Sequence, residues 1–281
     1  QKVTDTVWSK IKDFLHLGDF FNSENLDINV HINTKISGLQ KVEYYLQEVS
    51  DYSTVATAKD KIDWSKATTL NASDSALTKS DDQLQFTVSG RKKGYLFVRV
   101  TDQAGNVSDV YSTNLLIVDN ETPAAPEVTI ATYGTDTSDT TEVDTNKVGT
   151  WNTEQSIYQA PWTNKNVSIK LNGSNTVAQV DHYEYQVSAN ASFNDSDPWT
   201  SIGEMYDGKD AAPNEITVTD SSAKYYRFRA VSRTGVVGNS SAIYQVRIDK
   251  INPGQATLNF GGSEVQADTK YNVTDENPLS I

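Results

Sequence analysis

The chain contains no cysteine among its 281 residues. Disulfide bonds, thiolate nucleophiles and cysteine-ligated zinc sites are therefore excluded. Its three histidines, His16, His31 and His182, do not fall in an H-x-x-x-H or H-E-x-x-H arrangement, and neither G-x-S-x-G nor a phosphate-binding glycine loop is present. We therefore predict that the chain is not an enzyme, with no catalytic residue, no cofactor and no resident metal.

Basic residues and long apolar runs are also scarce. Twenty-four Lys and Arg stand against 37 Asp and Glu, which gives a net charge of −13. A surface of this sign repels phosphate backbones and anionic lipids, so we expect no nucleic-acid partner. No apolar run approaches the ~20 residues that a membrane helix needs, so we expect no membrane insertion in this segment.

The sequence does contain an internal repeat. The stretches G94-YLFVRVTDQAG and K224-YYRFRAVSRTG align without a gap, and the same shift later pairs Asp119 with Asp249 and Pro123 with Pro253. A second, slightly larger shift pairs V42-EYYL with Y183-EYQV. Two copies of one structural unit are therefore predicted, the first with an insertion.

Within the matched stretches, hydrophobic residues recur at every second position. Leu96, Val98 and Val100 alternate with Tyr95, Phe97 and Arg99, and residues 26–32 alternate in the same way. Period two with one apolar face predicts strands that are buried on one side only. Short strands of this kind, with ~100 residues in each unit, predict a β-sandwich.

Proline follows the last predicted strand of each unit, in D119-NETP and D249-KINP, where it ends the strand and stiffens the connection. These junctions set the expected boundaries: a lead-in over 1–24, a first unit over 25–121 with an inserted loop at about 47–85, a second unit over 122–251, and the start of a further unit or a C-terminal extension over 252–281.

The first residues show a different periodicity. Val7, Trp8, Ile11, Phe14 and Leu15 lie at helical spacing and predict a short amphipathic helix. Its polar face mixes acidic and basic residues, so it either packs on the first unit or binds a partner.

Two acidic stretches raise the question of calcium. In D102-QAGN the glycine persists as Gly235 in the second unit, whereas Asp102 becomes Ser232 and Asn106 becomes Val236. The glycine supplies the positive φ of a hairpin turn, so we interpret this stretch as a turn. Calcium bound by Asp102 and Asn106, or at the junction by Asp119 and Glu121, stays open as the alternative.

The loops carry aromatic residues. The predicted insertion contains Tyr52 and Trp64, and the matching part of the second unit contains Trp199 and Tyr206. Aromatic side chains on loops bind protein partners or stack on sugar rings, so these four are the candidate binding residues. The alternative is that Trp64 and Trp199 cap the open edge of each sandwich.

The order of the motifs G38-LQKVEYYL, V98-RVTDQAGNVS and L116-IVDNETP resembles the bacterial immunoglobulin-like (Ig-like) domains of Gram-positive cell-surface proteins. The second unit, with W162-TNKNVSIKL, Y183-EYQVS and F228-RAVSRTG, resembles a sister subtype. The resemblance implies an all-β fold of tandem Ig-like β-sandwiches after a short amphipathic N-terminal helix.

The same resemblance implies an extracellular, non-catalytic segment of a bacterial surface protein, monomeric and part of a larger protein. Such a segment presents a binding face for a host protein, with immunoglobulin as one specific version. The alternatives are a carbohydrate-binding accessory region of a secreted glycosidase, whose partner is a glycan, and a pure structural spacer.

Overall fold

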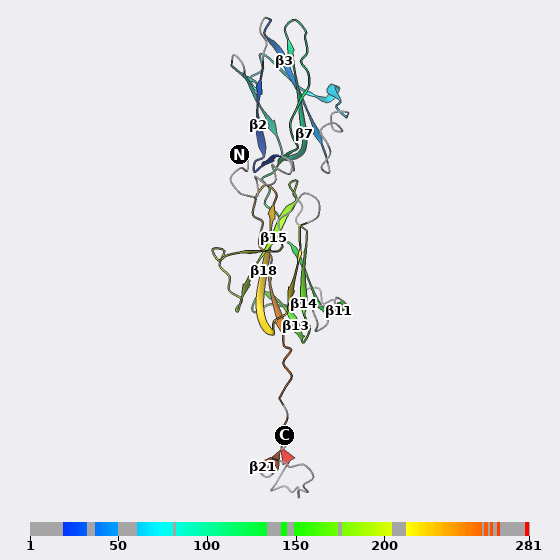
Figure 1. The fold of residues 1–281 in the computed structure, drawn as a ribbon. Coiled ribbons are helices and arrows are strands. Elements are labelled where there is room, and N and C mark those ends of the chain that lie inside the picture. Colours follow the sequence, from blue (N-terminus) through cyan, green and yellow to red (C-terminus); the bar gives the residue numbers. More distant parts are fainter. Residues whose placement is uncertain are drawn as a thin grey trace.

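A computed structural model of the chain shows two β-sandwiches stacked end to end (Figure 1). The predicted N-terminal helix lies outside the described residues. The structure describes residues 19–32, 37–49, 61–80, 83–133, 142–144, 149–173, 176–203, 212–254, 256–257, 259–260, 263–264 and 279–280.

The first sandwich has two sheets. One contains, in order, β1 (Asp19–Phe21), β9 (Leu116–Val118), β7 (Lys92–Asp102), β3 (Leu39–Glu48) and β4 (Thr68–Asn71), with β8 (Tyr111–Ser112) also pairing with β7. The other contains β2 (Asn25–His31), β6 (Gln83–Ser89) and β5 (Thr78–Lys79). The edge strand β1 runs parallel to β9, whereas the other paired strands are antiparallel.

The alternation in the sequence explains the first core. Leu84, Phe86 and Val88 of β6 are buried while the residues between them are exposed, and they face Leu96 and Val98 of β7. Burial of each such side chain contributes roughly 1.5–3 kcal/mol, so this apolar face fixes the register of the strands.

The outer face of β7 departs from the expectation of one wet side. Tyr95 and Phe97, which point away from the core, are buried as well. They form a second cluster with Phe20 and Ile117, against which Trp64 packs. The strand pattern could not reveal this layer, because it depends on loops folding back over the sheet.

The second sandwich repeats the plan. One sheet contains β11 (Glu142–Asp144), β10 (Glu127–Tyr133), β14 (Val167–Asn172) and β17 (Glu215–Val218). The other contains β12 (Thr150–Asn152), β13 (Ile157–Thr163), β19 (Ile243–Ile248), β18 (Ser222–Ser232), β15 (Val180–Ser188) and β16 (Thr200–Ser201). Its own core gathers Ile169, Leu171, Phe228, Ala230 and Val246.

The two sandwiches have matching strand registers. Glu43 of β3 lies opposite Arg99 of β7, and Glu184 of β15 lies opposite Arg229 of β18. Each unit packs a sheet of three or four strands against a six-stranded sheet, which is the two-sheet arrangement of immunoglobulin-like domains. The all-β fold of tandem Ig-like sandwiches, predicted from the sequence, is therefore confirmed.

Some elements lie across the expected boundaries. β1 belongs to the sheet of the first sandwich although it precedes residue 25, and the stretch expected as an inserted loop contains a 3₁₀ turn at Trp64–Lys66 followed by β4 and β5. The chain leaves the second sandwich through the exposed residues 251–254 (Figure 1).

Beyond that exit, a small antiparallel sheet contains β21 (Ser263–Glu264), β20 (Asn259–Phe260) and β22 (Leu279–Ser280). Within the described ranges, no helix has the length and apolar character required to cross a membrane.

Separate cores predict separate responses to a core mutation. Phe228→Ala removes a fully buried ring that packs between Tyr226 and Tyr244, and we expect it to lower the free energy of unfolding of the second sandwich by about 3–5 kcal/mol. Calorimetry should show the transition of the second sandwich moving farther than that of the first, which changes only through the shared junction. Val187→Ala on the exposed face of β15 is the control, and an equal shift of both transitions by Phe228→Ala would contradict separate cores.

Candidate functional site

The four predicted binding residues divide between described and undescribed regions. Tyr52 and Tyr206 lie outside the described residues. Trp64 lies in the 3₁₀ turn of the first sandwich and Trp199 just before β16 of the second, and both side chains are partly buried. The structure does not bring the two tryptophans together, but each lies against an arginine at the equivalent position of its own sandwich.

In the first sandwich, Trp64 lies against an arginine. The guanidinium carbon of Arg99 is 4.1 Å from the centroid of the Trp64 ring. The same guanidinium donates two hydrogen bonds to Glu43, at 3.0 and 3.1 Å, and Lys41 lies 3.2 Å from that carboxylate. A cation, a carboxylate, an arginine and a tryptophan therefore follow one another across the sheet, and we call this set the Arg–Trp stack.

The second sandwich has an Arg–Trp stack at the equivalent positions. Arg229 lies 4.0 Å from the centroid of the Trp199 ring and donates to Glu184 at 2.6 Å. His182 takes the place of Lys41, with its Nε2 3.4 Å from Glu184. The repeat aligned these residues in sequence, but only the structure shows that they touch.

The stack gives each tryptophan a structural task. A guanidinium against an indole ring contributes about 0.5–2 kcal/mol, so each stack fastens a loop to the outer face of its sheet. Other side chains also cover the rings, because Trp64 packs against the cluster of Phe20 and Phe97 and Arg227 lies 5.0 Å from the centroid of the Trp199 ring. A binding role for Trp64 and Trp199 stays a prediction.

The stacks shift the pKa values of their acids. The hydrogen bond from Arg99 lowers the pKa of Glu43 more than its partial burial raises it. In the second stack, the hydrogen bond from His182, together with Arg229, lowers the pKa of Glu184. Both carboxylates are therefore charged at neutral pH.

His182 is a buried cation at neutral pH. Burial alone lowers the pKa of its imidazole, but hydrogen bonds to Asp181 at 2.9 Å and to Glu184, with the charges of both carboxylates, outweigh that effect and raise the pKa to about 9. The sequence carries no signal of this role. An isolated histidine is usually interpreted as a surface residue, and that interpretation is wrong for His182, which lies within β15 and is buried.

A second cluster of polar contacts lies where the two sandwiches meet. Asp119 follows β9 directly and is fully buried. One carboxylate oxygen accepts the backbone N–H of Glu121 at 2.9 Å, and the other accepts the backbone N–H of Ala178, in the second sandwich, at 2.7 Å. The Nε atom of Arg91 lies 3.7 Å from the first oxygen, so the buried charge has a cation beside it.

The linker after Asp119 is held on both sides. The backbone N–H of Asp119 donates to the carbonyl of Phe21 in the first sandwich, and the carbonyl of Pro123 accepts the N–H of Asn239 in the second. Gly238 lies so close to Pro123 that an added Cβ would come within 2.8 Å of the ring. The junction is therefore a packed interface with hydrogen bonds to both units.

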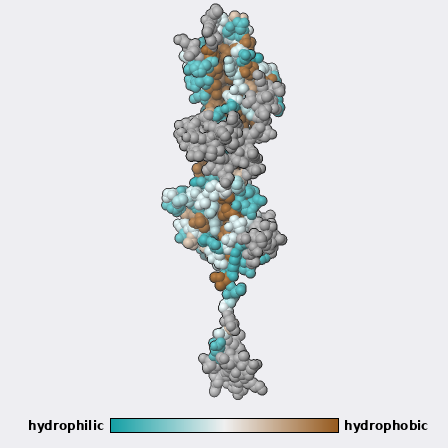
Figure 2. All heavy atoms as spheres, in the orientation of Figure 1, coloured by the Kyte–Doolittle hydropathy of each residue, from teal (hydrophilic) through white to brown (hydrophobic). Residues whose placement is uncertain are grey.

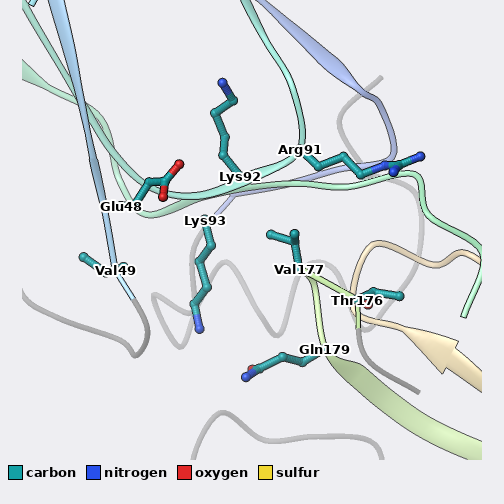
Figure 3. A pocket seen from close by; sticks show the side chains of 8 residues that line it. All are labelled: Glu48, Val49, Arg91, Lys92, Lys93, Thr176, Val177 and Gln179. Atoms are coloured by element: carbon teal, nitrogen blue, oxygen red, sulfur yellow. The ribbon is translucent and has the colours of Figure 1, made fainter. Parts of the chain in front are cut away.

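A cleft of about 280 Å³ lies beside this junction (Figure 3). Lys93 points into it from β7 toward Gln179, while Lys92 and Arg91 point away. Burial lowers the pKa of Lys92. Because the three cations diverge, the cleft does not concentrate their charge on one point.

The D102-QAGN stretch is a closed turn. Asn106 donates its backbone N–H to Asp102 at 2.8 Å and its side-chain amide to the other carboxylate oxygen at 2.9 Å, while Gly105 has a φ of +88°. In the second sandwich the Ser232 hydroxyl accepts the N–H of Val236 at 3.1 Å and Gly235 has a φ of +80°. Across the part of the chain that the structure describes, no group of three or more His, Cys, Asp or Glu residues is placed to hold a metal ion.

No protein-family model matches the chain, and no curated protein matches it. Among solved structures, the chain is similar to fibronectin(III)-like modules of Clostridium thermocellum CbhA, at 10% identity and a TM-score of 0.30, over 84% of this chain and 93% of that one. Two structures of a cytokine receptor complex are similar at 11% identity, with TM-scores of 0.25 and 0.26; each match covers 79% of this chain, and 90% and 98% of the other. These values are low, so the fold assignment rests on the strand order.

The raised pKa of His182 predicts a pH dependence. The folded state binds this proton more tightly than the unfolded chain, so its stabilisation is complete below about pH 6.5 and is lost as the pH rises through 9. We expect the second sandwich to lose about 2 kcal/mol of unfolding free energy over that range, allowing for solvent screening.

Urea titrations at several pH values measure this loss. His182→Gln should remove the pH dependence, whereas His31→Gln, at an exposed position on β2, should keep it. Equal slopes for His182→Gln and the unmodified chain would show that the imidazole is not held as a cation.

Proposed function

We propose that this chain is a non-catalytic stalk segment of a bacterial surface protein, which holds a binding face for a host protein at a fixed spacing and orientation. The observation that supports it is the junction at Asp119, where one buried carboxylate accepts N–H groups from the linker and from the second sandwich. A spacer needs such a joint, because a free linker would let the two units reorient independently.

The energetics of the joint favour a single orientation. Hydrogen bonds to a charged group contribute about 1.5–3 kcal/mol each, and a buried carboxylate that loses its donors is strongly unfavourable. Bending the linker between Asp119 and Pro123 would separate the Ala178 N–H from the Asp119 carboxylate, because Pro123 stays bonded to Asn239 of the second sandwich. The two sandwiches are therefore expected to move as one body.

Several described side chains that could serve acid–base chemistry are engaged in structural contacts instead. Glu43 and Glu184 hold the arginines of the two stacks, Asp119 holds the junction, and His182 lies between two carboxylates. This use of the acids supports a non-catalytic role.

The binding face itself is proposed from the sequence. Extra loop length on a repeated scaffold is a usual place for function, and the first unit carries it around Tyr52 and Trp64. A host protein, with immunoglobulin as one version, is the proposed partner, and a glycan is the alternative. A pure spacer would bind neither.

The stalk proposal predicts a shared orientation that depends on Asp119. Asp119→Ala should leave the Ala178 N–H without its acceptor and cost the junction about 2–4 kcal/mol. Residual dipolar couplings of the unmodified chain should fit one alignment tensor for both sandwiches. Those of Asp119→Ala should require a separate tensor for each sandwich. Asp109→Ala, at an exposed position before β8, should behave as the unmodified chain. Separate alignment tensors for the two sandwiches of the unmodified chain would contradict the stalk proposal.

The choice of ligand is tested by binding. The chain, immobilised on a resin and incubated with serum or mucosal secretions, should retain a host protein. On glycan arrays it should bind no sugar. Sugar binding that disappears in Trp64→Ala or Trp199→Ala would instead favour the carbohydrate-binding alternative, while no retained ligand in either experiment would favour a pure spacer.

A further inference from the structure

The end of the second sandwich repeats the geometry that ends the first. β1 and β9 pair in parallel with Phe21 opposite Val118, and β13 and β19 pair in parallel with Thr163 opposite Ile248. These pairings make Phe20 equivalent to Trp162 and Asp119 equivalent to Asp249.

The hydrogen bonds around the two aspartates also match. The N–H of Asp119 donates to Phe21 at 3.0 Å, and that of Asp249 donates to Thr163 at 2.9 Å. One oxygen of Asp119 accepts the N–H of Glu121 at 2.9 Å, and one oxygen of Asp249 accepts the N–H of Ile251 at 2.9 Å. Asp249 therefore makes the same hydrogen bonds at the end of the second sandwich as Asp119 makes at the end of the first.

The two ends differ in what covers them. Asp119 is fully buried and its second oxygen accepts the N–H of Ala178, whereas Asp249 is exposed and none of the recorded hydrogen bonds among the described residues reaches its second oxygen. Phe20 is 5% exposed but its equivalent Trp162 is 58% exposed. Trp162, Thr163, Asn164 and Asp249 line one shallow depression.

Apolar surface accompanies this depression. Ile251, at the position equivalent to Glu121, is 77% exposed. Figure 2 shows apolar atoms beside the chain where it leaves the second sandwich. Lys250 does not shield Asp249, because its ammonium group bonds to Asn166 and to the carbonyl of Thr219.

We propose that this end of the second sandwich is a docking face for a further β-sandwich unit of the same chain, following Pro253. The turn of that unit equivalent to the one that carries Ala178, between β14 and β15, would donate a backbone N–H to the second oxygen of Asp249 and cover Trp162 as Ala178 covers Phe20. The proposal rests on the stalk function and extends it, because the type of junction formed at Asp119 would recur at Asp249.

The occupant is chosen by chain geometry. Pro253 follows Asp249 at the spacing by which Pro123 follows Asp119, so a unit that follows it is joined by a connection of the same length as the first junction. A covalently linked unit also has a high effective concentration at this face, which a separate molecule lacks.

The first test uses the 281-residue chain. Asp249→Ala should move the unfolding midpoint of the second sandwich by less than about 1 °C, whereas Asp119→Ala should lower a midpoint by roughly 5 °C or more. Acrylamide should quench Trp162 freely, as measured by the difference from Trp162→Phe. An equal loss for Asp249→Ala would overturn the proposal, since Asp249 would then serve its own sandwich.

The second test duplicates residues 120–249 in tandem within the full chain, so that Asp249 is followed by a second copy of unit two in the register of Asp119. We expect the amide of the new copy's Ala178-equivalent residue to exchange at least tenfold more slowly than in the same chain with Asp249→Ala, and the Trp162 fluorescence to become shielded. Asp220→Ala, at an exposed site, is the control.

The natural junction is the internal reference in that molecule. If Ala178 at Asp119 is protected and its copy at Asp249 is not, the docking proposal is wrong and the stalk stands. If neither is protected, the stalk fails with it. A dimer of the 281-residue chain that Trp162→Arg abolishes would also overturn the proposal, because the face would then bind a second copy.

Discussion

A carboxylate taken out of water must be given hydrogen-bond donors, and the relation between the two sandwiches depends on how Asp119 meets that requirement. Its donors come from the linker and from Ala178 of the next unit, and Arg91 lies beside it. The charge is therefore satisfied only when both units are in place. Burial turns a common acidic residue at a strand end into the element that orients the molecule.

The repeat preserves physical roles more closely than residue types. A turn needs one oxygen acceptor beside a glycine, and Asp102 supplies it in the first sandwich while Ser232 supplies it in the second. A stack needs a cation behind its glutamate, which is Lys41 in one unit and protonated His182 in the other. The change from lysine to histidine gives the second stack a cation with a pKa of about 9.

The sequence predicts the strands well because their pattern is local. The alternation at Leu96 and Val98 determines which face of β7 packs into the core of the sandwich, and no distant residue is needed to see it. The burial of Phe97 on the opposite face, the arginine beneath Trp64 and the partner of Asp119 could not be predicted in this way. Each depends on a residue brought from elsewhere in the chain, and Ala178 is 59 positions from Asp119.

The parallel pairing of β1 with β9 has a mechanical meaning. In the first sandwich, the described chain enters at Asp19 and leaves at Asp119, and the two strands lie side by side in the same direction. Tension between those points slides one strand along the other, so their bridging hydrogen bonds resist in shear together instead of opening one after another. Such an arrangement suits a segment that must withstand pulling.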